Sequence, residues 1–134
     1  MPTASYNKFT PAIEPMLEAM NSGSDTWVVK LGTAVNQAAG TFTEVANGNG
    51  YTTGGNAATV STATQTGGTY KLVLNSPTAW TGSGAGFSFQ YAVLVDSTTS
   101  TNVAYWDYGS SQAVAVGETV TVTLDPTNGV FQAT

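Results

Sequence analysis

The segment spanning residues 86–108 constrains the fold of this chain more than any other part of the sequence. It is the most apolar stretch, and its large side chains recur at every second position, as they do along a β-strand. One predicted face carries Phe87, Phe89, Tyr91, Val93 and Val95. A polar run at residues 96–102 predicts a turn, after which a second strand begins. The segment therefore predicts a central β-hairpin with apolar groups on both faces, one against a core and the other against a helix, a loop or another subunit.

The rest of the chain predicts further short strands separated by turn signals. They are expected at residues 27–32, 41–45, 57–64, 69–75, 113–116, 118–124 and 130–133. A Gly-Gly pair at residues 67–68 predicts a tight hairpin turn, and the run Asp-Pro-Thr-Asn-Gly at residues 125–129 predicts another turn. The predicted fold class is mainly β: an antiparallel, jelly-roll-like β-sandwich with one N-terminal helix. We divide the chain into an N-terminal segment, residues 1–23, and a β-sandwich domain, residues 24–134.

An amphipathic helix is predicted in the N-terminal segment. Apolar side chains recur there at helical spacing, namely Phe9, Ile13, Met16, Leu17 and Met20. Thr10 can cap the helix, Pro11 fits its first position, and Gly23 can end it. Pro15 would be costly deep inside a helix, so the helix is expected to start near residue 14 or to kink there. Two interpretations stay open: the helix packs on the sandwich, or it is an arm that docks on a neighbouring subunit.

The run ANGNGYTTGGN at residues 46–56 predicts a long loop. A connection of this length with little regular structure is either functional or ordered by a partner. A phosphate-binding role is not predicted, because the run lacks the GxGxxG spacing and no helix follows it.

Charge is scarce in this chain. Charged residues make up 8% of the sequence, against about 25% in a typical domain, and the formal net charge is −5. The only cationic side chains are the lysines at positions 8, 30 and 71, and there is no histidine or cysteine. Three scattered lysines exclude binding to nucleic acid or to anionic membranes through clustered positive charge. No apolar run reaches the roughly 18–20 residues of a membrane span, and the polar start of the chain does not resemble a secretory signal.

Most catalytic sites need residue types that this chain does not contain. Without histidine or cysteine there is no base-activated serine or cysteine nucleophile and no ordinary zinc site. Asp107, between Trp106 and Tyr108, could serve a carboxylate-based glycosidase, but a structural role as a hydrogen-bond acceptor is favoured. An oxygen-only Ca²⁺ site is possible, but no stretch resembles the EF-hand loop spacing. We nevertheless predict that the protein is not an enzyme and uses no cofactor or metal. A sugar-binding aromatic platform, made of Trp80 and residues 105–108, is an alternative to burial of these aromatics.

Several short segments resemble, in order along the chain, a widespread family of small structural proteins from tailed bacteriophages. They are YNKF at residues 6–9, GSDTWVV at 23–29, ANGNGYTTGGN at 46–56, GGTYKLVL at 67–74, FQYAVLV at 89–95, WDYGSS at 106–111 and TNGV at 127–130. The resemblance implies a virion component, most of all a capsid decoration (cement) protein of jelly-roll type. Such a protein binds the outside of the major capsid shell and stabilises it. Pro11 and Pro15 depart from the unbroken opening helix expected in this family, which leaves the role of that segment open.

The resemblance also implies partners and a location. The expected partners are the phage major capsid protein and further copies of this chain, as a homotrimer or homodimer, without nucleic acid or membrane. The expected location is the capsid surface of the virion, after assembly in the host cytoplasm. Candidates for the subunit or capsid interface are Tyr6, Phe9, Ile13, Tyr51, Trp80 and Tyr105. The alternative function is a tail-associated structural module or a module of the virion that binds host glycans.

Overall fold

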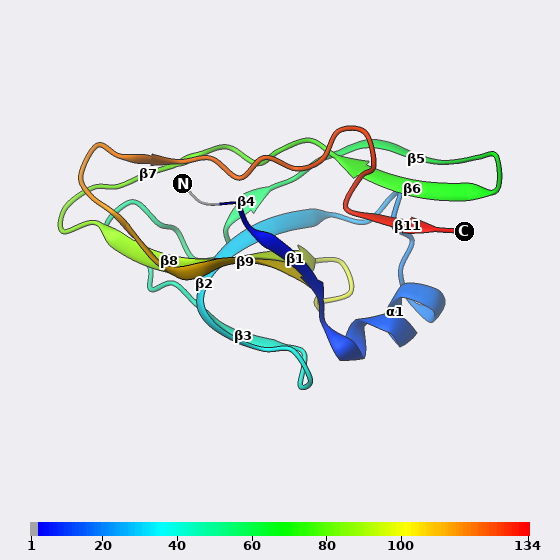
Figure 1. Cartoon of the computed structure of the whole chain (residues 1–134), viewed down its shortest axis with the longest axis horizontal. Coiled ribbons are helices and arrows are strands. Elements are labelled where there is room, and N and C mark those ends of the chain that lie inside the picture. The colour runs from blue at the N-terminus through cyan, green and yellow to red at the C-terminus, as the bar shows by residue number, and fades with distance from the viewer. Residues whose placement is uncertain (1–2) are drawn as a thin grey trace.

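The structure, a computed structural model, describes residues 3–134 apart from the side chain of Leu17. Its antiparallel strands lie in two layers, with one short helix beside them (Figure 1). The larger sheet has the order β1-β9-β8-β2-β3 and consists of β1 Ser5–Lys8, β9 Thr101–Val114, β8 Phe87–Asp96, β2 Trp27–Asn36 and β3 Thr41–Glu44, with β4 Asn56–Ala57 beside β2. The opposite layer holds a three-stranded sheet and a strand pair. The three-stranded sheet consists of β11 Phe131–Ala133, β6 Thr69–Leu74 and β5 Val60–Thr66, and the pair consists of β10 Thr119–Val120 and β7 Trp80–Thr81.

The predicted mainly β, antiparallel class with a single short helix is confirmed. The main core lies between the layers and includes Trp27 and Leu31 from β2, Leu72 from β6 and Leu94 from β8. Among the described residues the sheets contain six, three and two strands, which differs from the eight-stranded arrangement of a jelly roll. The jelly-roll detail of the prediction is therefore not confirmed.

The central hairpin is formed by β8 and β9, as predicted, but the expected alternation along β8 is wrong at one point. Phe89 packs with Leu94 in the main core, whereas Val93 and Val95 belong to a second cluster on the opposite face. The register with β9 shifts between Phe89 and Tyr91. Because a bulge breaks the two-residue period, the side chains on its two sides face different cores.

Strand boundaries in the C-terminal third also differ from the prediction. β9 continues as far as Val114 through Gly109, which takes a φ of +84°, so no separate strand begins near residue 113. β10 ends at Val120, although Val122 and Leu124 beyond it are buried. The hairpin turn between β5 and β6 and the turn after residue 125 lie where they were predicted.

The N-terminal segment differs most from its prediction. Its first described residues include β1, which pairs with β9, although no strand was predicted there. The helix α1 covers only Ile13–Glu18 and follows a 3-10 helix, η1, at Thr10–Ala12. Thr10 makes no side-chain cap, and the helix ends well before Gly23. Pro15 lies in the first turn of α1, where its missing N–H costs no helical hydrogen bond.

A second cluster of buried side chains joins this segment to the outer face of the larger sheet. Phe9 and Ala12 are buried against Val93, Val95 and Tyr105, and the ring centroids of Phe9 and Tyr105 are 5.0 Å apart. The second apolar face of the central hairpin is thus covered by the chain's own N-terminal segment. The packing therefore continues across the predicted division between residues 23 and 24.

Candidate functional site

The structure divides the predicted interface residues into exposed and buried side chains. Tyr6 and Ile13 are 44% and 46% exposed. The remaining candidates belong to core clusters, namely Phe9, Tyr51, Trp80 and Tyr105. A side chain inside a core cannot meet a partner while the chain stays folded, so the interface assignment of these four is corrected to a core assignment. Large aromatics suit both environments, and their position in the sequence does not distinguish them.

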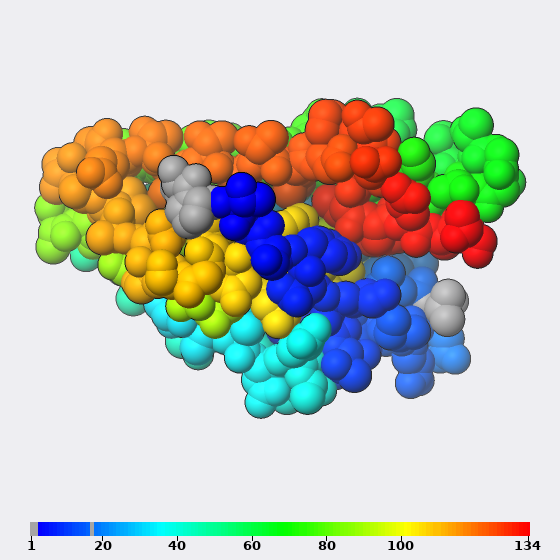
Figure 2. Space-filling view, in the orientation of Figure 1, coloured from blue at the N-terminus to red at the C-terminus, as the bar shows by residue number. Residues whose placement is uncertain are grey.

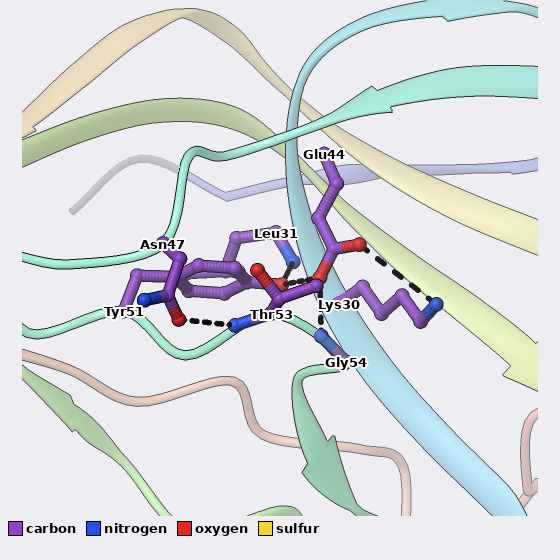
Figure 3. A network of polar contacts seen from close by, with 7 residues as sticks. All are labelled: Lys30, Leu31, Glu44, Asn47, Tyr51, Thr53 and Gly54. Carbon is purple, nitrogen blue, oxygen red and sulfur yellow. Dashed lines mark hydrogen bonds and ion pairs between the residues drawn. The ribbon is translucent and has the colours of Figure 1, made fainter.

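Tyr51 fastens the loop of residues 46–56 to its own chain (Figure 3). Its ring is buried, and its hydroxyl donates to Glu44 Oε1 at 2.6 Å. The same hydroxyl accepts the backbone N–H of Leu31 at 3.2 Å. The N–H of Gly54 donates to the same oxygen of Glu44 at 2.7 Å. The loop is thus held by contacts within its own chain.

The polar network around Tyr51 includes an ion pair and a tyrosine hydroxyl that keeps its proton. Lys30 Nζ lies 3.8 Å from the Glu44 carboxylate. Burial, and then the hydrogen bond to Glu44, raise the pKa of Tyr51 far above its ordinary value, so its hydroxyl remains a donor.

We expect Tyr51→Phe to lower the free energy of unfolding by about 1–3 kcal/mol, because it leaves the buried N–H of Leu31 without this acceptor. Urea unfolding measures the change. Tyr6→Phe is the matched control, since its exposed ring should leave stability within about 0.5 kcal/mol. Equal effects of the two substitutions would contradict a stabilising role for the network.

Two neighbouring hollows open on the side of the sandwich where β1 is the edge strand of the larger sheet. One, of about 440 Å³, is lined by Thr3, Ala4, Trp106, Tyr108 and residues 121–126. The other, of about 300 Å³, is lined by Tyr6, Trp106, Asp125 and residues 128–132. Because Trp106 and Asp125 line both hollows, we treat them as one feature, the flank groove, defined by Tyr6, Trp106, Tyr108 and Asp125. Figure 2 shows this face, where the blue N-terminal segment lies against the orange and red C-terminal segments.

Aromatic side chains form one wall of the flank groove. Tyr6 on β1 is the cross-strand partner of Trp106 on β9, and their rings meet edge to face with centroids 5.6 Å apart. Trp106 and Tyr108 are half-buried and pack against the main core. The wall is therefore a firm surface in which Tyr6 is the most exposed ring.

The opposite wall is an extended segment with few backbone partners. Val122 and Leu124 anchor it through buried side chains, and Leu124 N–H donates to Ser76 Oγ at 2.9 Å. Within the described part of the chain, residues 121–123 belong to no strand and make no backbone-to-backbone hydrogen bond. β1, across the groove, pairs with β9 alone among the described strands. Both walls therefore offer backbone groups to an added strand.

Asp125 places a negative charge where the two hollows meet. Its Oδ1 accepts the backbone N–H groups of Thr127 at 2.8 Å and of Asn128 at 2.9 Å. These hydrogen bonds, that of Asn128 foremost, hold the pKa of Asp125 below its ordinary value, so it is ionised at neutral pH. The turn motif at residues 125–129 predicted the local conformation of Asp125, but no sequence signal placed it beside Trp106.

Among the described residues, no helix is long and apolar enough to cross a bilayer, and no group of three or more acidic side chains could hold a metal ion. A comparison of the chain with protein-family models, with curated proteins and with solved structures finds no match.

Proposed function

We propose that this protein is a capsid decoration protein of a tailed bacteriophage, which binds the outside of the major capsid shell and stabilises it. The observation that carries the proposal is the flank groove, where an edge strand and an unpaired extended segment face each other beside the exposed ring of Tyr6 and the half-buried ring of Trp106. We further propose that the groove receives an extended segment of the major capsid protein as an added strand.

Strand addition explains why this side of the sandwich is left open. An added strand gains main-chain hydrogen bonds, and pockets for its alternate side chains give specificity. Tyr6 and Trp106 supply the kind of aromatic anchor that is enriched at protein interfaces. The Asp125 carboxylate and the net charge of −5 favour a neutral or basic partner segment over an acidic one.

The proposal includes self-association and a location. A homotrimer or homodimer would place several flank grooves over a junction between shell subunits, so that each copy adds buried area to the shell. The protein would act at the virion surface after assembly in the host cytoplasm, without catalysis.

Copy number in the virion tests the proposal directly. We expect quantitative mass spectrometry of purified particles to give a ratio to the major capsid protein of one or a simple fraction of one. A handful of copies per particle would instead indicate a tail component. Absence from the particle would overturn the proposal.

We expect Tyr6→Ala to weaken binding to shells that lack the protein by at least about tenfold, because truncating a central aromatic anchor commonly has this effect. A pelleting assay with purified shells measures the change. Val116→Ala is the matched control, because Val116 is 64% exposed and lies outside the flank groove. Equal affinities of the two variants would remove the groove from the interface.

A second candidate function is the binding of a neutral host glycan in the same groove. The observation that favours it is the proximity of Trp106 and Tyr108 to Asp125, since aromatic faces with a nearby acceptor suit sugars. Trp80 is buried and drops out of the predicted platform. A glycan array followed by tryptophan fluorescence titration tests this function. Binding lost in Asp125→Asn, which keeps the oxygen that accepts the turn hydrogen bonds, would favour it.

A further inference from the structure

Two carboxyl groups that are far apart in the sequence meet at one end of the sandwich. Asp25 lies just before β2, and Asp96 is the last residue of β8, opposite Trp27 in the register of the two strands. The residues beside them hold the segments together. Thr26 N–H donates to Thr98 Oγ1 at 2.8 Å, and Thr26 O accepts the N–H and the hydroxyl of Ser97, both at 2.9 Å. The meeting of the two carboxyl groups is thus built into strand pairing and turn contacts.

The Asp96 side chain is fully buried, and only half of its carboxyl group is satisfied. Oδ1 accepts the backbone N–H groups of Thr98 at 3.0 Å and of Thr99 at 3.2 Å. Oδ2 is buried and has no hydrogen-bond partner among the described residues. The Asp25 carboxyl lies within hydrogen-bonding reach of Asp96. An unpaired buried carboxylate oxygen beside a second carboxyl group requires a positive charge or a proton between them.

The surroundings contain many oxygen atoms. The hydroxyls of Thr99 and Thr101 lie 2.9 Å apart next to Asp96, and Asp25 Oδ2 is held by the N–H of Asn21 at 3.0 Å. Burial, and then the neighbouring Asp25 carboxyl, raise the pKa of Asp96, because both disfavour its charged form. Asp25 is only half-buried, so the pair is open to solvent from its side.

We propose that Asp25 and Asp96 bind a hard divalent cation of the calcium type, with hydroxyl, carbonyl and water oxygens completing its coordination. Calcium takes 6–8 oxygen ligands in flexible geometry, and waters commonly supply several of them. Two carboxylates give a modest site, and we expect a dissociation constant on the order of 10⁻⁴–10⁻³ M. The bound cation would link the start of β2 to the turn between β8 and β9. This proposal is independent of capsid binding, and either can fail alone.

Thermal unfolding of the full chain tests the site. After treatment with EDTA at neutral pH, we expect added CaCl₂ at about ten times the dissociation constant to raise Tm by roughly 4–6 °C, and NaCl of equal ionic strength to leave it unchanged. Asp25→Asn and Asp96→Asn should both abolish the rise. Asp96→Asn should still fold, because its amide oxygen can accept the turn N–H groups while its NH₂ group faces Asp25. Glu14→Gln, at an exposed carboxyl, should keep the full response.

Terbium luminescence gives a second readout, because Trp27 beside Asp96 can sensitise a lanthanide bound in a calcium site. We expect emission from the unaltered chain that CaCl₂ displaces, and none from Asp96→Asn. An equal calcium response in all variants would overturn the proposal. A missing calcium response would also overturn it if the pH dependence of Tm differed between the two chains. In that case the Tm of the unaltered chain would fall as pH rises above the ordinary aspartate pKa, and the Tm of Asp96→Asn would not. That result would mean that the pair shares a proton.

Discussion

Gly55→Ala is expected to lower the free energy of unfolding by more than about 4 kcal/mol. Folded domains have a total stability of about 5–15 kcal/mol, so this loss can remove most of it. Gly55 takes a φ of +68°, and a Cβ atom there would lie 2.1 Å from the carbonyl oxygen of Val29. That oxygen belongs to β2, an interior strand of the larger sheet, and cannot move without breaking the pairing with β4. Soluble yield and urea unfolding followed by circular dichroism measure the effect.

Gly54→Ala is the control for this prediction. Gly54 also has a positive φ, +100°, but a Cβ atom there would meet nothing within 4 Å. Its substitution should cost only the backbone strain, about 1–3 kcal/mol. If both variants lost the same stability, the close approach of the loop to β2 would not be the cause.

Phe9→Ala is expected to lower the free energy of unfolding by about 3–5 kcal/mol, as truncations of buried phenylalanines commonly do. Phe9 is fully buried and packs on Tyr105 in the cluster that covers the outer face of the larger sheet. Its loss should also loosen β1 and α1, so hydrogen exchange there should accelerate before global unfolding. Urea unfolding and exchange mass spectrometry measure the two effects.

Ile13→Ala tests whether this effect comes from burial. Ile13 is 46% exposed, so its truncation should cost less than about 1 kcal/mol. A Phe9→Ala variant as stable as Ile13→Ala would show that the second cluster contributes little. Because the N-terminal segment supplies both a strand and a core aromatic, deleting residues 1–22 would impair folding and could not isolate a docking role.

The flank groove shows which parts of a site can be predicted from local sequence patterns and which cannot. Trp106 was recognisable as a candidate for an aromatic platform, and the turn containing Asp125 was recognisable from its residues. Their proximity depends on β9 and the segment after β10 coming together from opposite layers. The Asp25–Asp96 pair was not foreseen for the same reason, since strand pairing and turn contacts between distant segments bring its members together.

Features that depend on a few neighbouring residues could be predicted from the sequence alone. These are the antiparallel class, the central hairpin, the Gly-Gly turn between β5 and β6, and the turn after Asp125, each set by side-chain alternation or by backbone preferences of glycine, proline and asparagine.

Which apolar groups are buried depends on the packing of distant segments and could not be predicted from local patterns. Tyr6 and Tyr51 are alike as residues, yet one is exposed on an edge strand and the other is closed into the main core. The bulge in the central hairpin changed which residues of β8 face that core. Phe9, which had been predicted as part of the apolar stripe of a helix, instead packs on the opposite face of the sheet. Burial depends on which distant segments pack against a residue. Alternation and helical spacing depend only on its neighbours along the chain, so they cannot predict that packing.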